Sequence, residues 1–414
     1  MGFFSRSSNT TSPKEAKPDA KKPEISENAV FVPIEHPVSG SVSQPEVPND
    51  KAVTDEEKEK RYQEVLNHFQ NPDLEYPLSS DDKEKKEKLT TVEKAWLTKE
   101  CFLRYLRACT WKVSDAIDRL ENSVVWRREY GISNGVYGKH DPITGKYQIP
   151  ELAAKALSPE TVVDESLTGK QIVFGFDKGC RPCLFLMNGK ENTKPSETQV
   201  QFLIFMLECV INYMPQGQDK LALCVDFKEY PVGLKSKSVP SVSVGKSVLH
   251  ILQYHYPERL GRALFVNIPF VASVFLKLCW PFLDPYTKQK VSFDNPFSDF
   301  IPTEQLMDEY ENGEVEFVFD HDKYWKGLIE IGVKKNQHYL ERFLELGATV
   351  GLSEVDLRSN EAIPGSDGKT VNYTTEEFQD AISTASVGDN LEKLHISDAP
   401  VEKKDPEVVE PVQA

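Results

Sequence analysis

The most constraining feature of the 414-residue sequence is an almost entirely apolar run from Phe265 to Phe282. Its length approaches the roughly 20 apolar residues that a membrane-spanning helix needs. Four residues interrupt the run, namely Asn267, Pro269, Lys277 and Pro281. We therefore do not predict a spanning helix. We expect the end of a buried strand up to Ile268 and then a helix from about Pro269 to Phe282.

The side chains of this predicted helix are apolar on nearly every face. They include Phe270, Val274, Phe275, Leu278 and Phe282. A helix with so little polar surface is buried in a core, faces lipid or covers an apolar cavity, and composition alone favours the core. The charge around it favours lipid, because residues 254–291 hold five cationic and two anionic side chains in a chain of net charge −16. A locally basic apolar segment suits an anionic membrane surface.

A second helix start follows the apolar run. Asp284 is a favourable N-cap, and Pro285 suits the first helical position. Thr287 and Lys290 then lie three residues apart, on one face of the first turn. Free backbone N–H groups, a hydroxyl and an ammonium converge there, which is an arrangement that suits a phosphate. The two features together indicate a phospholipid with its tails inside the protein, beside the apolar helix, and its headgroup at this corner.

Short apolar strands alternate with helices from about residue 171 onward, which predicts an α/β fold with a mostly parallel sheet. The strands are expected at residues 171–176, 182–187, 221–227, 264–268, 291–293 and 315–319, and the helices at 196–214, 243–254, 269–282 and 324–346. Before the sheet, residues 55–69 and 91–131 have the periodicity of amphipathic helices, and Ser114 is the expected N-cap of the last one. Residues 72–88, with a run of mixed charge, are expected to form a linker.

These patterns divide the chain into five parts. We expect a disordered tail over residues 1–54, a helical module over 55–150, the α/β domain over 151–330, a C-terminal helix and extension over 331–358, and an acidic disordered tail over 359–414. The acidic balance of the chain argues against nucleic acid as a partner. Seven scattered cysteines fit a reducing compartment.

The sequence carries no clear signature of an enzyme or a metal site. Cys180 and Cys183 have no second pair at zinc spacing, so we expect two small buried residues there. Residues 244–247 end like a phosphate-binding loop, but Pro240 occupies the place of its first glycine. A nucleophile elbow, a zinc-protease motif and a dinucleotide fingerprint are all absent from the sequence. We expect no catalytic residue, no metal and no cofactor other than a lipid ligand.

Several short motifs can be compared with known families. They are Leu103–Ala108 (LRYLRA), Trp126–Arg128 (WRR), Tyr256–Gly261 (YPERLG), Asn267–Phe270 (NIPF) and Pro281–Thr287 (PFLDPYT). Over about residues 55–358 the chain resembles the CRAL-TRIO lipid-binding family, which includes the secretory-type phosphatidylinositol transfer proteins of yeast. Residues 95–98, 218–219 and 351–358 are most similar to the fungal pleiotropic-drug-resistance branch of that family.

The resemblance implies a specific architecture and a specific ligand. A helical module would precede a domain whose sheet carries a hydrophobic pocket, closed by a gating helix that corresponds to residues 269–282. Phosphatidylinositol would be the ligand, with its inositol phosphate held by Glu258, Thr287 and Lys290. The alternative for Glu258 is an ion pair with Arg259 or Arg262. For Lys290 the alternative is a solvated surface position.

The chain departs from the family pattern at one place in the helical module. Family members often carry a basic residue just after the motif that ends at Ala108, whereas Cys109 and Thr110 stand there in this sequence. A headgroup contact from this loop would have to come from the Thr110 hydroxyl.

The resemblance also implies a function outside the class of enzymes. The protein would exchange phosphatidylinositol and a second apolar lipid, a sterol, at membranes, and would influence lipid metabolism and azole tolerance. It would be cytoplasmic and peripheral at the endoplasmic reticulum, lipid droplets or the cell periphery, with a phosphoinositide kinase acting downstream. Two other classes stay open, a lipid-modifying hydrolase, which needs an activated nucleophile, and a regulatory scaffold that acts through the tails.

Overall fold

The structure is a computed structural model, and it describes residues 26–38, 42, 53–133, 136, 157–231 and 242–361. The expected boundary at residue 150 and most of the two expected tails lie outside the described residues. Residues 26–38 were expected to be disordered, which is wrong. Val30 forms a parallel β-bridge with Phe317, and its backbone N–H donates to the Glu316 carbonyl at 2.8 Å.

The helical module contains α1 (Asp55–Phe69), α2 (Thr91–Trp96), α3 (Lys99–Ala108) and α4 (Val113–Glu129). The apolar face predicted for α1 comprises Tyr62, Val65, Leu66 and Phe69. Tyr62, Val65 and Phe69 are buried in the core of the module, and Leu66 packs against it partly buried. The prediction that Ser114 caps α4 is wrong. Lys112 occupies that position without a capping side chain, and the Ser114 hydroxyl donates to the neighbouring Asp115 carboxylate.

The expected linker between α1 and α2 is an antiparallel hairpin of β1 (Glu75–Pro77) and β2 (Lys86–Lys88). Its side chains are largely exposed, so hydrophobic periodicity could not indicate it. A buried arginine on α4 holds it instead. The Arg128 guanidinium donates to the carbonyls of Tyr76, Pro77, Glu87 and Lys88 and forms an ion pair with Glu93.

The described residues of the second domain form a five-stranded sheet in the order β3-β4-β5-β6-β7. The strands are β3 (Gln171–Phe176), β4 (Pro182–Met187), β5 (Leu221–Asp226), β6 (Leu260–Val266) and β7 (Val291–Phe293). Only the β3–β4 pair is antiparallel, which confirms the expected α/β class. The prediction of a strand at residues 315–319 is wrong, because this segment forms only isolated β-bridges, at Val315 and at Phe317.

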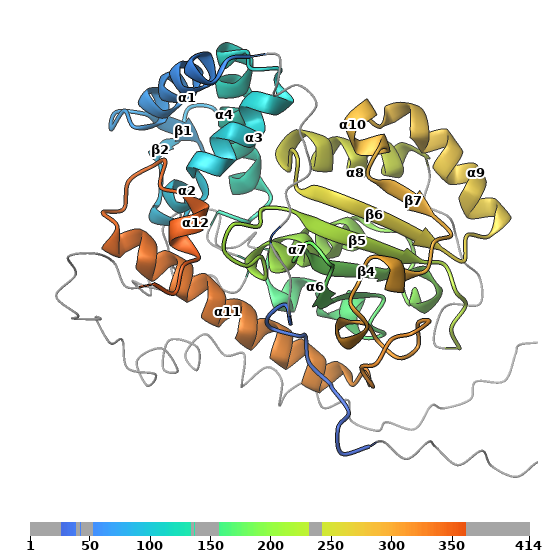
Figure 1. Cartoon of the computed structure of the whole chain (residues 1–414). Coiled ribbons are helices and arrows are strands. Elements are labelled where there is room, and N and C mark those ends of the chain that lie inside the picture. The colour runs from blue at the N-terminus through green and yellow to red at the C-terminus, as the bar shows by residue number, and fades with distance from the viewer. Residues whose placement is uncertain are drawn as a thin grey trace, which may run out of the picture.

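Seven helices in the described part of the chain accompany or follow the sheet. They are α6 (Pro159–Ser166), α7 (Glu197–Asn212), α8 (Val242–His255), α9 (Phe270–Cys279), α10 (Pro285–Lys288), α11 (His321–Glu345) and α12 (Glu354–Leu357). The predicted start of α7 is confirmed, since the Ser196 side chain accepts from the backbone N–H of Gln199. Figure 1 shows the helical module at one end of the sheet and α11 running along the molecule from that module.

The two faces of the sheet are covered to different extents. On one face Phe185 is fully buried and packs against Phe297 and Tyr310. On the other face, which the strand register assigns to alternate residues, Leu186, Leu223 and Phe265 are only partly buried. The second face therefore retains accessible apolar surface.

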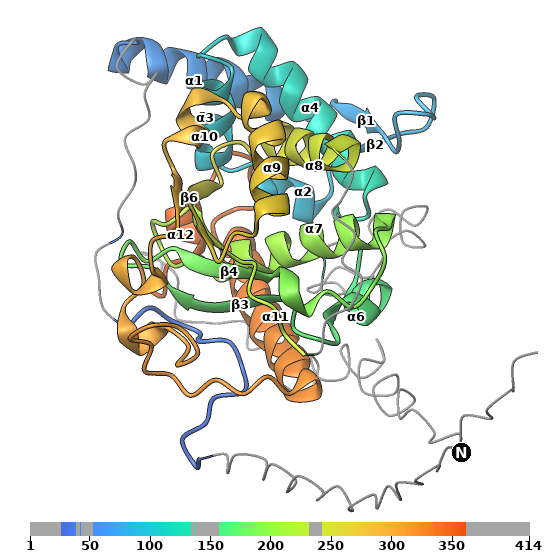
Figure 2. The ribbon, with the colours of Figure 1, turned by 90° about the vertical axis from the view of Figure 1, so that its right-hand side faces the viewer.

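Helix α9 lies on the side of the molecule where α8 and α10 are found (Figure 2). It packs on α8, where a Cβ added to Gly245 would lie 2.9 Å from the Phe275 ring. Its other faces are open, and Phe270 is 83% exposed and Leu278 52% exposed. The composition of this helix favoured a buried core position, which is wrong. Among the described residues, no helix is both long enough and apolar enough to cross a membrane.

Candidate lipid-binding site

The predicted helix start after the apolar run is present in the structure. Asp284 is the N-cap of the short α10, and its carboxylate accepts from the Thr287 backbone N–H at 2.8 Å. The Thr287 hydroxyl donates to the same carboxylate, and Thr287 is partly buried. The hydroxyl is therefore engaged within its own turn in this structure, and an incoming phosphate would have to compete with Asp284 for it.

Glu258 lies in the segment that precedes β6 and has a positive φ of 58°. Its side chain is largely buried and accepts a hydrogen bond from Arg107 Nε at 2.8 Å. The alternative partners expected from the sequence, Arg259 and Arg262, are wrong. Arg259 pairs with Glu354, and Arg262 lies over the ring of Phe300.

Arg107 is the site residue that sequence analysis missed. It lies on α3, in the helical module, and joins Glu258 across 151 positions of sequence. Arg104, one helical turn earlier, forms ion pairs with two other carboxylates, those of Asp219 and Glu354. The LRYLRA motif was the available signal, but the helical period alone does not tell which arginine meets which carboxylate.

Lys290 is 9% exposed and does not form an ion pair with any described carboxylate. Its ammonium donates to the Leu260 carbonyl at 2.7 Å and lies 3.6 Å from the centre of the Tyr286 ring. Burial and, to a smaller extent, the nearby Lys220 ammonium lower the pKa of Lys290 to about 8, against the opposing effect of Glu258. The sequence alternative of a solvated surface lysine is therefore wrong, and a buried cation is available to an anion.

Thr110 is the remaining predicted headgroup contact. It lies in the turn after α3 with a positive φ of 50°, and its side chain is exposed. Its backbone N–H donates to the Arg107 carbonyl, but its hydroxyl has no hydrogen-bond partner among the described residues. The structure thus brings Glu258 and Lys290 into one charged group with Arg107, and leaves the Thr110 contact as a prediction.

The predicted gating residues divide between two environments. Phe270, Val274, Leu278 and Phe282 are exposed, whereas Phe275 packs against α8. The Lys246 ammonium of α8 lies 4.3 Å from the centre of the Phe282 ring, so a cation accompanies the apolar surface.

The chain enters α9 through a tight turn. Asn267 has a positive φ of 55°, and its side-chain amide donates to Asp226 at 2.7 Å. Asp226 is completely buried at the end of β5, so this hydrogen bond fixes the turn to the sheet. Two residues later Pro269 is the N-cap of α9, not its first helical residue.

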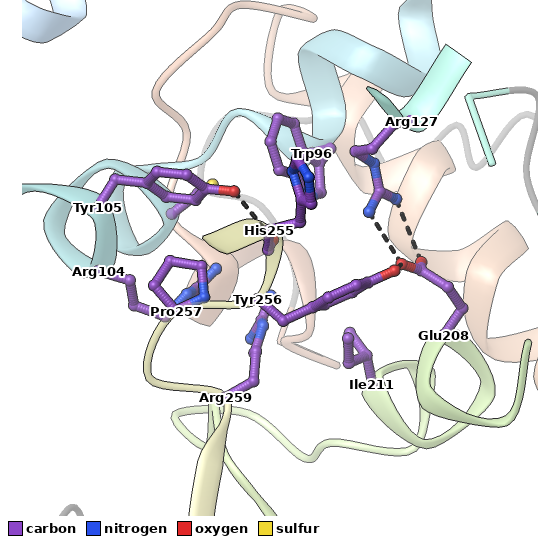
Figure 3. Close-up of a pocket in the computed structure, with 11 residues that line it drawn as sticks. Trp96, Arg104, Tyr105, Arg127, Glu208, Ile211, His255, Tyr256, Pro257 and Arg259 are labelled. Carbon is purple, nitrogen blue, oxygen red and sulfur yellow. Dashed lines mark hydrogen bonds and ion pairs between the residues drawn. The ribbon is translucent and has the colours of Figure 1, made fainter. Parts of the chain in front are cut away.

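A small cavity of about 30 Å³ lies where the helical module meets the second domain (Figure 3). Its wall contains the ion pair between Arg127 and Glu208, and the Tyr256 hydroxyl donates to the same carboxylate at 2.5 Å. Burial lowers the pKa of His255, which also lines this cavity, to about 3, so its imidazole is neutral at physiological pH. The cavity is about as large as one water molecule, roughly 30 Å³, and its polar groups already pair with each other. We assign it a structural role.

The structure thus consists of an α/β domain and a helical module that contributes Arg107 to the charged group around Glu258. The chain belongs to the CRAL-TRIO family. The CRAL/TRIO domain model matches residues 167–313, and the CRAL/TRIO N-terminal domain model matches residues 61–122.

Curated relatives support this assignment. The chain is 39% identical over 309 residues to the phosphatidylinositol transfer protein PDR17 of Saccharomyces cerevisiae, and the match covers 73% of this chain and 84% of that protein. It is also 39% identical over 349 residues to the CRAL-TRIO domain-containing protein C23B6.04c of Schizosaccharomyces pombe, and the match covers 84% of this chain but only 31% of that relative.

More distant relatives are also found. The SEC14 cytosolic factor of Candida glabrata is 28% identical over 227 residues, which cover 50% of this chain and 68% of that protein. The crystal structure of Sfh5 matches with a TM-score of 0.38 and 16% identity, over 60% of this chain and 83% of that chain. This last similarity is too weak to carry an argument.

Proposed function

We propose that the protein binds phosphatidylinositol and transfers it between membranes without covalent chemistry. The observation that carries this proposal is the buried Lys290 ammonium, which is held by a carbonyl and an aromatic ring and has no carboxylate of its own. A phosphodiester at this corner would supply the missing negative charge. The names of the relatives PDR17 and SEC14 cytosolic factor support this lipid class.

Each part of the lipid has a counterpart in the site. The inositol phosphate would lie between Lys290 and the start of α10, and the ring hydroxyls would donate to Glu258. The acyl chains would lie on the partly exposed sheet face, against Leu186, Leu223 and Phe265. Helix α9 would cover them, and its exposed apolar residues would contact the bilayer during exchange.

Four further proposals depend on branch resemblance and not on contacts in the site. The second ligand is a sterol, and the protein influences lipid metabolism and azole tolerance through it. A phosphoinositide kinase receives the presented lipid. The protein acts from the cytoplasm at the surface of the endoplasmic reticulum, lipid droplets or the cell periphery. Thr110 donates a hydrogen bond to the headgroup.

The transfer proposal is tested by removing both predicted headgroup contacts. In the variant Glu258→Ala with Lys290→Ala, transfer of phosphatidylinositol between donor and acceptor vesicles should fall to background. The circular dichroism spectrum should stay that of the wild type. The reason is that the variant removes both a buried cation and an acceptor for the ring hydroxyls.

A matched control also removes one lysine and one glutamate. Lys326 and Glu330 form an exposed pair one turn apart on α11, and the variant Lys326→Ala with Glu330→Ala should transfer normally. Wild-type transfer by a folded Glu258 and Lys290 double variant would refute the headgroup assignment.

A further inference from the structure

The carboxyl end of α8 is held by side chains from the helical module. The last four carbonyls of a helix have no partner within the helix itself. In α8 they belong to residues 252–255. The Leu252 carbonyl accepts from the Tyr256 backbone N–H at 3.2 Å, just beyond the helix. The other three carbonyls accept from side chains of α3 and α4, so the helical module completes the end of a helix that belongs to the second domain.

Arg119 of α4 supplies two of these three hydrogen bonds. Its Nε donates to the Tyr254 carbonyl at 2.9 Å, and its Nη2 donates to the Gln253 carbonyl. The Tyr105 hydroxyl supplies the third, to the His255 carbonyl at 2.9 Å (Figure 3). A positive charge is favourable at the carboxyl end of a helix, and charged donors bind carbonyls more strongly than neutral ones. Arg119 is therefore the stronger of the two attachments.

The guanidinium of Arg119 is itself held in place by neutral groups. Its Cζ lies 5.0 Å from the centre of the Tyr254 ring and 5.6 Å from the centre of the Tyr105 ring. Its Nη1 donates to the Sγ of Cys109, the residue that follows α3, at 3.9 Å. A lysine at position 109 would bring a second cation close to this guanidinium and repel it. The neutral Cys109 side chain thus permits Arg119 to reach α8.

Helix α8 is linked in turn to the end of α9. The side-chain amide of Gln253, whose carbonyl binds Arg119, donates to the Phe282 carbonyl at 3.1 Å. Phe282 is the last residue of the 3-10 turn that follows α9. Closer to the start of α8, a Cβ added to Gly245 would lie 3.4 Å from the Cys279 sulfur of α9. Gln253 therefore joins Arg119, through its main chain, to the end of α9, through its side chain.

We propose that Arg119 is a positioning residue for lipid exchange, because it holds α8 as the fixed support from which α9 opens. The inference rests on the proposed function, in which α9 covers the acyl chains. Opening would break the bond between Gln253 and Phe282, and Arg119 keeps the Gln253 backbone where this bond can form. Lipid enters and leaves through the same opening, so a loosened α8 should raise both rates and leave the equilibrium affinity unchanged.

Two measurements on the full-length protein test this proposal. Stopped-flow fluorescence follows the release of pyrene-labelled phosphatidylinositol from the loaded protein to phosphatidylcholine vesicles, and calorimetry gives the affinity for short-chain phosphatidylinositol. Arg119→Met should release the lipid about fivefold faster, which corresponds to the loss of one ordinary hydrogen bond from the closed state. Its affinity should stay within about twofold of the wild type. This split between rate and affinity distinguishes a positioning role from a general loss of stability.

Further variants test the individual links. Gln253→Leu should speed release to a similar extent, and its combination with Arg119→Met should be no faster than either single variant, because both remove the same contact. Cys109→Lys should also speed release by repelling Arg119, whereas Cys109→Ser should not. Arg61→Met is the matched control, because Arg61 of α1 also donates to a backbone carbonyl, that of Trp111, which lies outside α8.

Several outcomes would overturn the proposal. They are a wild-type release rate in a folded Arg119→Met variant, and additive effects on the rate in the double variant. A loss of affinity as large as the gain in release rate would also overturn it, because Arg119 would then stabilise the bound lipid and not the closed helix. If Arg119→Met failed to fold, the release rates of Gln253→Leu and Cys109→Lys would decide. A wild type that does not bind phosphatidylinositol would refute the proposed function itself.

Discussion

The ammonium of Lys290 is surrounded by groups that affect its charge in opposite directions. Burial and the Lys220 ammonium disfavour the protonated form, while Glu258 and Asp284 favour it. The outcome is a pKa of about 8, compared with an ordinary value of 10.5. Lys290 is therefore charged at neutral pH but close to losing its proton, so the proposed headgroup binding would depend on pH.

We expect phosphatidylinositol affinity to be constant below pH 8 and to fall as the pH rises above it. The affinity should fall, not rise, with increasing pH, because the phosphate binds the ammonium and not the neutral amine, and the ammonium loses its proton above its pKa. The variant Lys290→Arg should keep its positive charge, so its affinity for phosphatidylinositol should stay constant up to about pH 10. Binding measured by calorimetry between neutral and alkaline pH checks this, and a wild-type profile that stays level through pH 9 would contradict it.

Individual site residues differ in how far the sequence could predict them. Thr287 followed from local capping chemistry, since Asp284 and Pro285 set the helix start a few residues away. Lys290 was predicted from its position three residues after Thr287 and from the family motifs, whereas Glu258 was predicted from the family motifs alone. Arg107 could not be predicted, because its partner lies 151 positions away and only the packing of the helical module on the sheet brings them together.

Helix α9 exposes the kind of surface that globular proteins usually bury. Phe270, Val274 and Leu278 are exposed along α9, and contacts with α8 hold its other side. Phe282 is also exposed, in the turn after α9 and beside Lys246 of α8. Exposed apolar patches of this kind mark interaction sites. The start of α9 was predicted to within one residue from Pro269, whereas its end is Cys279 and a 3-10 turn covers the expected last residues Trp280–Phe282. Its exposure was not predicted, because composition cannot distinguish a core helix from an exposed apolar one.

The variant Phe270→Ser with Leu278→Ser should reduce co-sedimentation with anionic vesicles by about tenfold or more, because the transfer of each large side chain into lipid is lost. The free energy of unfolding should change by less than about 0.5 kcal/mol, since both side chains are exposed. Vesicle sedimentation and urea titration measure the two effects. Val355→Ser, at another exposed apolar position, is the control, and wild-type sedimentation of the α9 variant would show that another surface binds the membrane.

Elements that depend on distant partners were the ones the sequence did not predict. The β1–β2 hairpin is held by Arg128, and residues 26–38 are held by Val30 beside Phe317. Neither has an apolar periodicity of its own. The strands β3, β4 and β5 were predicted to within one residue because continuous apolar runs between turn residues are a local signal.

At the scale of the whole molecule, a buried network of charges joins the helical module to the second domain. Arg104 of the module is 2% exposed and binds Asp219 and Glu354. Glu354 also binds Arg259, and its pKa is well below the ordinary value: burial opposes this shift, but Arg104 and Arg259 outweigh it. This network therefore links α3 to the segments that precede β5 and β6 and to α12.

Replacing Arg104 by alanine should lower the free energy of unfolding by about 3–5 kcal/mol, because two buried carboxylates lose their shared partner. Denaturant titration at neutral pH checks this. The exposed Lys326→Ala should change stability by less than about 0.5 kcal/mol. If Arg104→Ala lowered the free energy of unfolding no more than the control does, the helical module and the second domain would be held together mainly by apolar contacts.

Helix α11 has 25 residues and is therefore about 37 Å long. It contacts α2 of the helical module as well as α6 and α7 beside the sheet. One continuous helix thus bridges the two parts of the molecule. If lipid exchange follows the proposed function, it would require the contact between α9 and α8 to open while α11 stays in place, so substitutions at that contact would change the exchange rate more than the stability of the rest.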